Sequence, residues 1–219
     1  MSESVKTRRP YTSPRHNELR RQTRRAVIDA ARTLFADRGY RATTIEALAT
    51  EAGVAVQTVY AAFGNKRSVL RALLDTVVAG DDEQRTVLER ARADLDGITD
   101  PDQRLDRVLR FGTEILGRSA DIYRILRGAA AGDQDLQADL EEGHRRRYQD
   151  VQAFIELVVD GQLSTKDLDH AADVCFAIFS YETYELLVDQ RGWSTERWQR
   201  WIRDTLSSTL TITSGWGAV

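Results

Sequence analysis

Apolar side chains recur at intervals of three and four residues along most of this 219-residue chain, a spacing that places them on one face of an α-helix. The first such stripe consists of Val27, Ala30, Ala31, Leu34 and Phe35. Gly39 follows the stripe as a helix terminator. Only three prolines interrupt the chain, and its composition favours helix over strand. The sequence therefore predicts an all-α protein.

Longer stripes beyond Gly80 predict a second, larger helical domain. The expected helices cover about 101–116, 122–129, 136–161, 168–188 and 198–210. The one over 168–188 is apolar around much of its circumference and so needs more than one packing partner. The expected organisation is a basic flexible arm over 1–20, an N-terminal domain over 21–80 and a helical domain over 81–213.

Two short helices joined by a glycine turn follow the first stripe. Thr43 stands three residues before Glu46, which is the spacing of a capping box at a helix start. Gly53 supplies the left-handed backbone of the turn, and a second short helix is expected over 56–62. Asn65 is expected to cap a fourth helix. A longer helix followed by two short ones is the arrangement of a helix-turn-helix DNA reader.

The formal charge of −3 is unevenly distributed. Residues 1–67 contain thirteen Lys and Arg against six Asp and Glu, a net +7, and the remainder carries −10. This division indicates that the first third meets a polyanion and that the acidic body has another task.

The second short helix must enter a DNA major groove and read base edges. Gln57 can pair with an adenine edge, and Thr58 can bond a base or a phosphate. Tyr60 and Lys66 suit phosphates, which fix register without reading sequence. The predicted DNA-binding residues are Thr44, Ala55, Val56, Gln57, Thr58, Tyr60 and Lys66.

The run from Thr43 to Val54, together with the later positions of the motif, resembles the signature of the tetracycline-repressor (TetR) family of bacterial regulators. Those later positions are Thr58, Val59, Tyr60, Phe63, Lys66 and Leu70. The resemblance covers residues 21 to about 80. It implies a DNA-binding motif over 44–63, a ligand-binding and dimerisation body, and release from the operator by a small molecule. Ala55 departs from the Ser or Thr that often caps the reading helix, and Ser68 departs from a frequent acidic residue.

Aromatic side chains of the body are candidates for the lining of a ligand cavity, with Glu114 or Arg118 as polar anchors. The predicted ligand-binding residues are Phe111, Glu114, Tyr123, Phe154, Phe176, Phe179 and Tyr181. Aromatic residues at helical spacing also form ordinary core or a dimer seam, and that alternative stays open.

Other chemistry-bearing groups favour ordinary roles. The run Arg145–Arg147 lies among acidic residues and predicts a solvated, ion-paired face. The three histidines lack the spacing of metal ligands. Cys175 lies on an apolar stripe and is expected in the core. No catalytic constellation and no cofactor motif is present, so the chain is not expected to be an enzyme. The arm could enter a minor groove or be a solvated tail.

The leading hypothesis is a homodimer on a palindromic double-stranded DNA operator. Helices over 136–160 and 165–190 would form the dimer seam, and the helix over 66–79 would be the lever that a small-molecule effector moves. A cytoplasmic location is expected because no secretion signal or membrane span is evident. The resemblance implies repression, and activation stays open. Two other classes of protein also stay open: an architectural DNA binder without an effector, and an enzyme or carrier in which the motif is vestigial.

Overall fold

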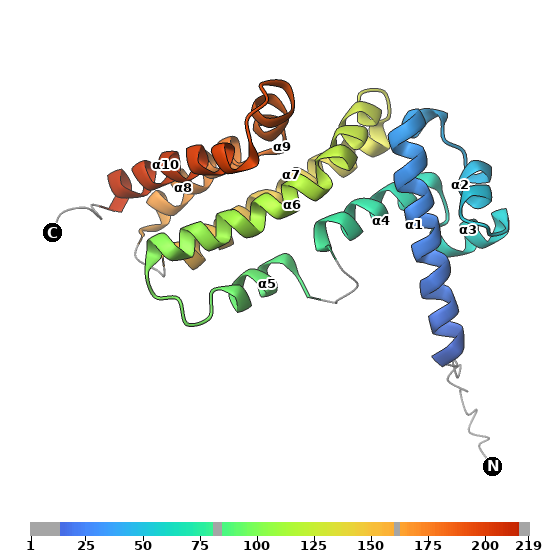
Figure 1. Ribbon diagram of the computed structural model, residues 1–219, viewed down its shortest axis with the longest axis horizontal. Helices are drawn as coiled ribbons and strands as arrows, with labels where there is room; N and C mark the ends of the chain where they lie inside the picture. The colour runs from blue at the N-terminus through green and yellow to red at the C-terminus, as the bar shows by residue number, and fades with distance from the viewer. Residues whose placement is uncertain (1–13, 81–84, 160–162, 215–219) are drawn as a thin grey trace, which may run out of the picture. The chain divides into compact units, whose positions relative to one another are not determined.

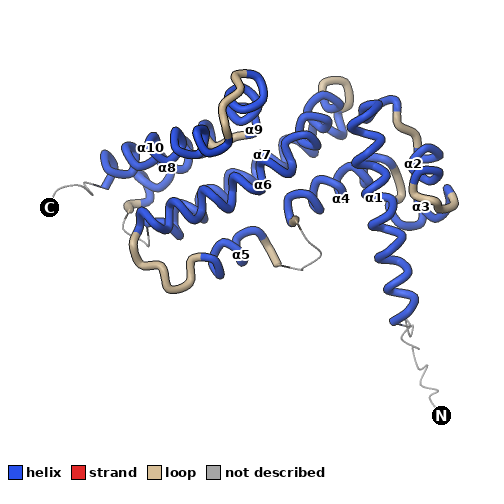
Figure 2. The backbone as a smooth tube through the Cα atoms, viewed as in Figure 1, coloured by secondary structure: helices blue, strands red, loops and turns tan. Residues whose placement is uncertain are grey.

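The structure is a computed structural model that describes residues 14–80, 85–159 and 163–214, and every regular element among them is helical (Figure 1, Figure 2). The all-α prediction is confirmed. The chain divides into two compact units, one ending at Leu73 and one starting at Leu74. This division falls inside helix α4 (Lys66–Ala79), whereas the sequence placed the boundary at the end of that helix.

The first unit contains α1 (Pro14–Ala42), α2 (Ile45–Glu51), α3 (Val56–Phe63) and the start of α4. Its core is formed by apolar residues of all four helices. The fully buried ones include Val27, Phe35, Leu48, Val59, Val69 and Leu70. The backbone at Gly39 is non-helical, with φ 76°, as expected for a glycine that interrupts a helix.

Helix α1 begins earlier than the sequence predicted. Residues 14–20 are helical, so the prediction of a flexible arm is wrong for them, and residues 1–13 lie outside the described part. Glu18 bonds Arg21 and Gln22 at helical i,i+3 and i,i+4 spacing. Such pairs stabilise a solvent-exposed helical turn that has no apolar stripe to reveal it.

The cap of α2 is one residue later than predicted. Thr44 is the N-cap, and its hydroxyl oxygen accepts a hydrogen bond from the Ala47 amide at 3.2 Å. The hydroxyl of Thr43 is instead buried at the end of α1, 2.9 Å from the carbonyl oxygen of Gly39. The turn at Gly53 has φ 66°, and the N-cap of α3 is Ala55, which provides no side-chain cap, as predicted.

The second unit is built around two long helices that run side by side, α6 (Pro101–Ala130) and α7 (Gln134–Val159) (Figure 1). Helices α5 (Val87–Asp94) and α8 (Thr165–Ile178) pack against α7. The last helix, α10 (Thr195–Ser214), packs on α8 and α6. Trp198, Ile202 and Leu206 are its fully buried anchors.

Three element predictions in this unit are wrong. Helix α5 was not expected; a capping box between Thr86 and Glu89 starts it. Helix α6 is one helix and not two, since it continues through Gly117 and on to Ala130. The helix expected over 168–188 is broken by an extended backbone at Ser180, after which come α9 (Tyr181–Tyr184) and a π-helix, η1 (Glu185–Gln190).

Candidate functional sites: a helix-turn-helix and a cavity

The outer face of α3 carries most of the predicted DNA-reading side chains. Ala55, Gln57 and Tyr60 are exposed, and Tyr60 is 49% exposed, which is unusual for a large ring. Val56 and Thr58 are half-buried. Val59 and Phe63 point inward and fix the helix to the first unit. The exposed row can therefore meet base edges while the helix stays rigidly held.

Thr44, at the start of α2, is exposed, but its hydroxyl oxygen already accepts the Ala47 amide. The hydroxyl hydrogen of this cap bonds the Glu46 carboxylate, and the Glu46 amide and then this hydroxyl lower the pKa of that carboxyl. The sequence predicted the helix cap at Thr43. In the structure Thr44 is the cap, in addition to the DNA contact predicted for it.

Lys66 is mainly engaged within the first unit. Its ammonium donates to the carbonyl oxygens of Tyr40 at 2.8 Å and Thr43 at 2.7 Å, and it lies 4.3 Å from the centre of the Tyr40 ring. Burial lowers the pKa of Lys66. These contacts leave one of three N–H groups for the predicted phosphate, so the larger role of Lys66 is to join α4 to the α1–α2 junction.

Arg24 is a positioning residue that sequence reasoning missed. Its guanidinium donates to the carbonyl oxygen of Ala62 at 2.6 Å and lies 4.3 Å from the centre of the Phe63 ring. A cation at the last carbonyls of a helix is favourable, so Arg24 holds the C-terminal end of α3 against α1. No spacing rule links residues so far apart in the chain.

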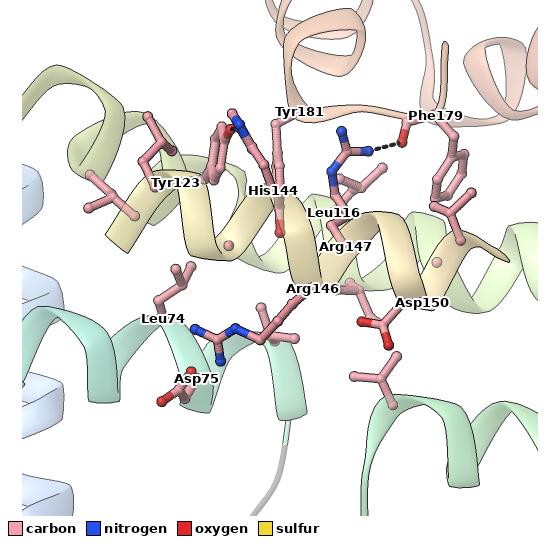
Figure 3. Close-up of a pocket in the computed structure, with 18 of the residues that line it drawn as sticks. Leu74, Asp75, Leu116, Tyr123, His144, Arg146, Arg147, Asp150, Phe179 and Tyr181 are labelled. Atoms are coloured by element: carbon pink, nitrogen blue, oxygen red, sulfur yellow. Dashed lines mark hydrogen bonds between the residues drawn. The ribbon is translucent and has the colours of Figure 1, made fainter. Parts of the chain in front are cut away.

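The second unit contains a cavity of about 220 Å³ (Figure 3). Most of its wall is apolar, from α4, α5, α6, α7 and the segment after α8. The apolar lining consists of Leu74, Val78, Val87, Gly112, Ile115, Leu116, Leu126, Leu140, Gly143, Val151, Phe154 and Phe179. The polar lining consists of Asp75, Tyr123, His144, Arg146, Arg147, Asp150 and Tyr181. An apolar wall with a few converging polar groups is typical of a small-molecule site.

The predicted ligand-binding residues divide into two groups. Tyr123, Phe154, Phe179 and Tyr181 line the cavity. Phe111 and Glu114 do not line this cavity; they border a separate, arginine-rich groove. Phe176 is not part of the lining, and its ring packs against the guanidinium of the lining residue Arg147. Successive side chains of an α-helix point about 100° apart around its axis. A residue next to one in the cavity wall can therefore face away from the cavity.

Arg118, proposed as a polar anchor, does not line the cavity. Its Nε donates to the carbonyl oxygen of Val77 at 2.7 Å, and its Nη2 donates to that of Val78 at 2.6 Å. Gly80 follows with φ 84°, and a Cβ there would come within 2.7 Å of the guanidinium carbon. Arg118 thus fastens the C-terminal end of α4 to α6.

Two stacked tyrosines form one end of the cavity. The rings of Tyr123 and Tyr181 lie 4.0 Å apart, and the Tyr181 hydroxyl is 2.9 Å from that of Ser119. The Tyr123 hydroxyl bonds His144 and donates to Glu182 at 3.2 Å. Burial raises the pKa of Tyr123, with Glu182 adding to the rise. Burial, and then Arg147, lowers the pKa of His144, so the imidazole is neutral near pH 7.

The three consecutive arginines have different environments. Arg145 and Arg146 pair with Glu142, as predicted for a solvated face. The prediction is wrong for Arg147, which is half-buried and bonds the carbonyl oxygens of Phe176 and Phe179. Burial lowers the pKa of Arg147. Arginine clusters do not by themselves reveal which member turns inward.

The remaining groups of the described part have structural environments. Cys175 is buried in the core, as predicted, and burial raises its pKa to about 12. No group of three or more potential metal ligands is gathered among the described residues. None of the described helices is long and apolar enough to cross a membrane.

A reading helix on a trihelical unit, followed by a larger helical unit, defines a DNA-binding transcriptional regulator. Residues 27–73 match the model of the bacterial regulatory proteins, tetR family. The HTH-type transcriptional regulator YvkB of Bacillus subtilis (strain 168) is 28% identical over 176 residues, which cover 78% of this chain and 87% of YvkB.

Solved structures share the fold at low identity. The fatty acid degradation regulator FadR from Bacillus halodurans aligns with a TM-score of 0.65 and 19% identity, over 84% of this chain and 94% of that one. A transcriptional regulator from Saccharomonospora viridis in complex with choline aligns with a TM-score of 0.62 and 23% identity, over 85% and 96%. Over residues 27–73 the chain is therefore similar to the tetR family of bacterial regulatory proteins, and the solved structures show that the fold extends over most of the chain.

Proposed function

We propose that this regulator represses transcription as a homodimer on a palindromic operator and leaves that operator when a small molecule fills the cavity. Helix α4 is the observation that carries the proposal. Its first residue, Lys66, bonds the α1–α2 junction, and its later residues Leu74, Asp75 and Val78 line the cavity. One continuous helix thus both contacts the α1–α2 junction and lines the cavity. A ligand that moves the second half of this helix would therefore also move the reading motif.

The thermodynamic requirement is a difference in affinity. A ligand releases DNA only if it binds the DNA-free arrangement of the protein more tightly than the DNA-bound one. The cavity walls formed by α4 and by α6 and α7 supply such a difference if their separation changes. The complex of the related Saccharomonospora viridis regulator with choline supports a small molecule as the effector class.

On the DNA side, Gln57 is proposed to read a base and Thr58 a base or phosphate, with Tyr60 on a phosphate. Thr44, Ala55 and Val56 would lie beside the same groove. In a homodimer, the two reading helices would address half-sites about 34 Å apart. The regions 136–160 and 165–190 are proposed to form the seam, and the 51% exposure of Leu186 in η1 supports an apolar contact there.

Fluorescence anisotropy with a palindrome from the region upstream of its own gene tests DNA recognition. We expect affinity that falls steeply with salt, because binding releases counterions from phosphates. Gln57→Ala should relax preference at one base position, and Tyr60→Phe should weaken binding to all sequences equally. Gln103→Ala, an exposed glutamine of α6, is the matched control and should change neither.

Absence of binding to any DNA, or binding that does not depend on salt, would refute the DNA-binding role. Operator affinity that no small molecule changes would refute the release step and favour an architectural DNA binder. Sedimentation of the free protein as a monomer at all concentrations would refute the homodimer.

A further inference from the structure

Arg147 is the side chain of the cavity whose surroundings are least complete. Figure 3 shows its guanidinium between Tyr181 and Phe179. Its Nη1 donates to the carbonyl oxygens of Phe176 at 3.1 Å and Phe179 at 3.0 Å. Its Nε–H is buried and has no acceptor within the described ranges. A buried donor without an acceptor is costly, and proteins rarely retain one without a reason.

The charge of Arg147 also lacks a partner. No carboxylate of the described residues forms an ion pair with it, and the acid that influences it most, Glu182, is already bonded by Tyr123 and lies 3.8 Å from Arg127. The two carbonyl oxygens at the end of α8 carry only partial negative charge. A buried cation with dipoles but no anion around it favours the arrival of an anion.

The groups beside Arg147 fit a single negative charge joined to an apolar body. His144 is neutral near pH 7 and adds no competing cation, and the Tyr123 and Tyr181 rings form a flat apolar wall. Asp75 and Asp150 also line the cavity and disfavour a second negative charge on the ligand. The cavity of about 220 Å³ favours a small molecule as its occupant.

We infer that the effector is a small monocarboxylic acid with an apolar chain or ring, and that the guanidinium of Arg147, a residue of the cavity lining, binds its carboxylate. A planar carboxylate matches the planar guanidinium and accepts short, charge-assisted hydrogen bonds. This inference rests on the proposed function, because it names the chemical class of the molecule that enters the cavity. A cationic effector would need Asp75 or Asp150 as its partner. Arg146 already acts on the Asp150 carboxyl, and the charge of Arg147 would repel such a ligand.

Isothermal titration calorimetry of the full-length chain tests the inference without any substitution. Octanoate and phenylacetate are each compared with the primary amide and the amine of the same carbon skeleton. We expect one site per chain, with the carboxylate binding at least about tenfold more tightly than its amide and the amine most weakly, since only the carboxylate supplies the missing charge. Equal or tighter binding of the amides or amines, or no binding by either acid, would overturn the inference.

Two variants locate the carboxylate. Arg147→Lys keeps the charge but removes the planar guanidinium, and it should weaken carboxylate binding about tenfold or more while leaving amide binding unchanged. Arg145→Lys, an exposed neighbour paired with Glu142, should change neither. Thermal unfolding checks that both variants fold. If Arg147→Lys does not fold, the ring nitrogens of His144 in the wild-type protein report by NMR, and no shift on adding the acid would overturn the assignment.

DNA release is measured separately, so the two proposals fail in different ways. Acids that bind at Arg147 without changing operator affinity would leave this inference standing and refute the release step. A different class of compound that releases the operator while the acids do not bind would refute this inference and leave the proposed function intact.

Discussion

The bonds between Arg118 and the end of α4 permit a quantitative test of how the helix is held. We consider Arg118→Met, which keeps an unbranched apolar chain and removes the guanidinium. The substitution breaks the bonds to the carbonyl oxygens of Val77 at 2.7 Å and Val78 at 2.6 Å. Both acceptors lie at the C-terminal end of a helix, where the carbonyl groups have no partner in the next turn.

A hydrogen bond to a charged group contributes about 1.5–3 kcal/mol, and the half-buried position of Arg118 favours the lower end. Two such bonds give a loss of about 3 kcal/mol in the free energy of unfolding of the second unit. At about 2–4 °C per kcal/mol for a chain of this size, the Tm should fall by roughly 6–12 °C. The amide of Gly80, bonded to Thr76 at 2.9 Å, should also exchange faster.

Arg124→Met is the matched control, because it makes the same substitution in the same helix. Arg124 pairs with Asp189 at 2.6 Å and Glu185 at 3.5 Å, and its side chain is 47% exposed. Exposed ion pairs contribute about 0–1 kcal/mol, so its Tm should fall by less than about 4 °C. Calorimetry and hydrogen exchange measure both variants. Equal falls in Tm, or unchanged exchange over residues 74–80 in Arg118→Met, would refute the argument that Arg118 holds α4.

Three further predictions concern single side chains of the second unit. Because the pKa of His144 lies below its ordinary 6.5, the unfolded chain binds the proton more readily; stability from this residue is present above pH 6.5 and is lost as the pH falls below it. His144→Gln should therefore flatten the fall in unfolding free energy between about pH 7 and pH 5 in urea titrations, and an unchanged slope would contradict this. The Cys175 thiol, with its pKa raised to about 12, should not react with Ellman's reagent at about pH 8 until the protein is unfolded; rapid reaction of the native protein would show the burial to be wrong. Leu186→Asp should weaken self-association about tenfold or more in sedimentation, whereas Leu19→Asp, 61% exposed in the first unit, should not; equal behaviour would exclude η1 from the seam.

The first unit could be predicted from the sequence because its signals are local. Gly53 and the uncapped Ala55 define the turn within a few residues, and the structure has both as expected. The capping residue was misplaced because Thr43 and Thr44 are chemically equal candidates. The choice between them depends on the Gly39 carbonyl, which accepts the hydroxyl of Thr43 only once α1 has ended and turned.

The cavity was predicted only in part, because its lining depends on helix rotation and on contacts distant in sequence. Tyr123 and Tyr181 line the cavity, but aromatic type gave no reason to separate them from Phe111 or Phe176, which do not. Arg147 was missed because charge type alone assigns an arginine to the surface. Its inward position is revealed only by acceptors about thirty residues further along the chain.

The missed break near Ser180 accounts for both the shape and the chemistry of the cavity. In an unbroken helix over 168–188, the carbonyl oxygens of Phe176 and Phe179 would accept backbone amides four residues later, and Arg147 would have no acceptor. The break instead gives the Ser180 amide to the Thr183 hydroxyl and leaves both carbonyl oxygens to the guanidinium. It also places Phe179 and Tyr181 in the cavity wall. The capping bond at Ser180 therefore frees the carbonyl oxygens that hold Arg147 inward, and it leaves a cation in the cavity wall that a carboxylate would pair with.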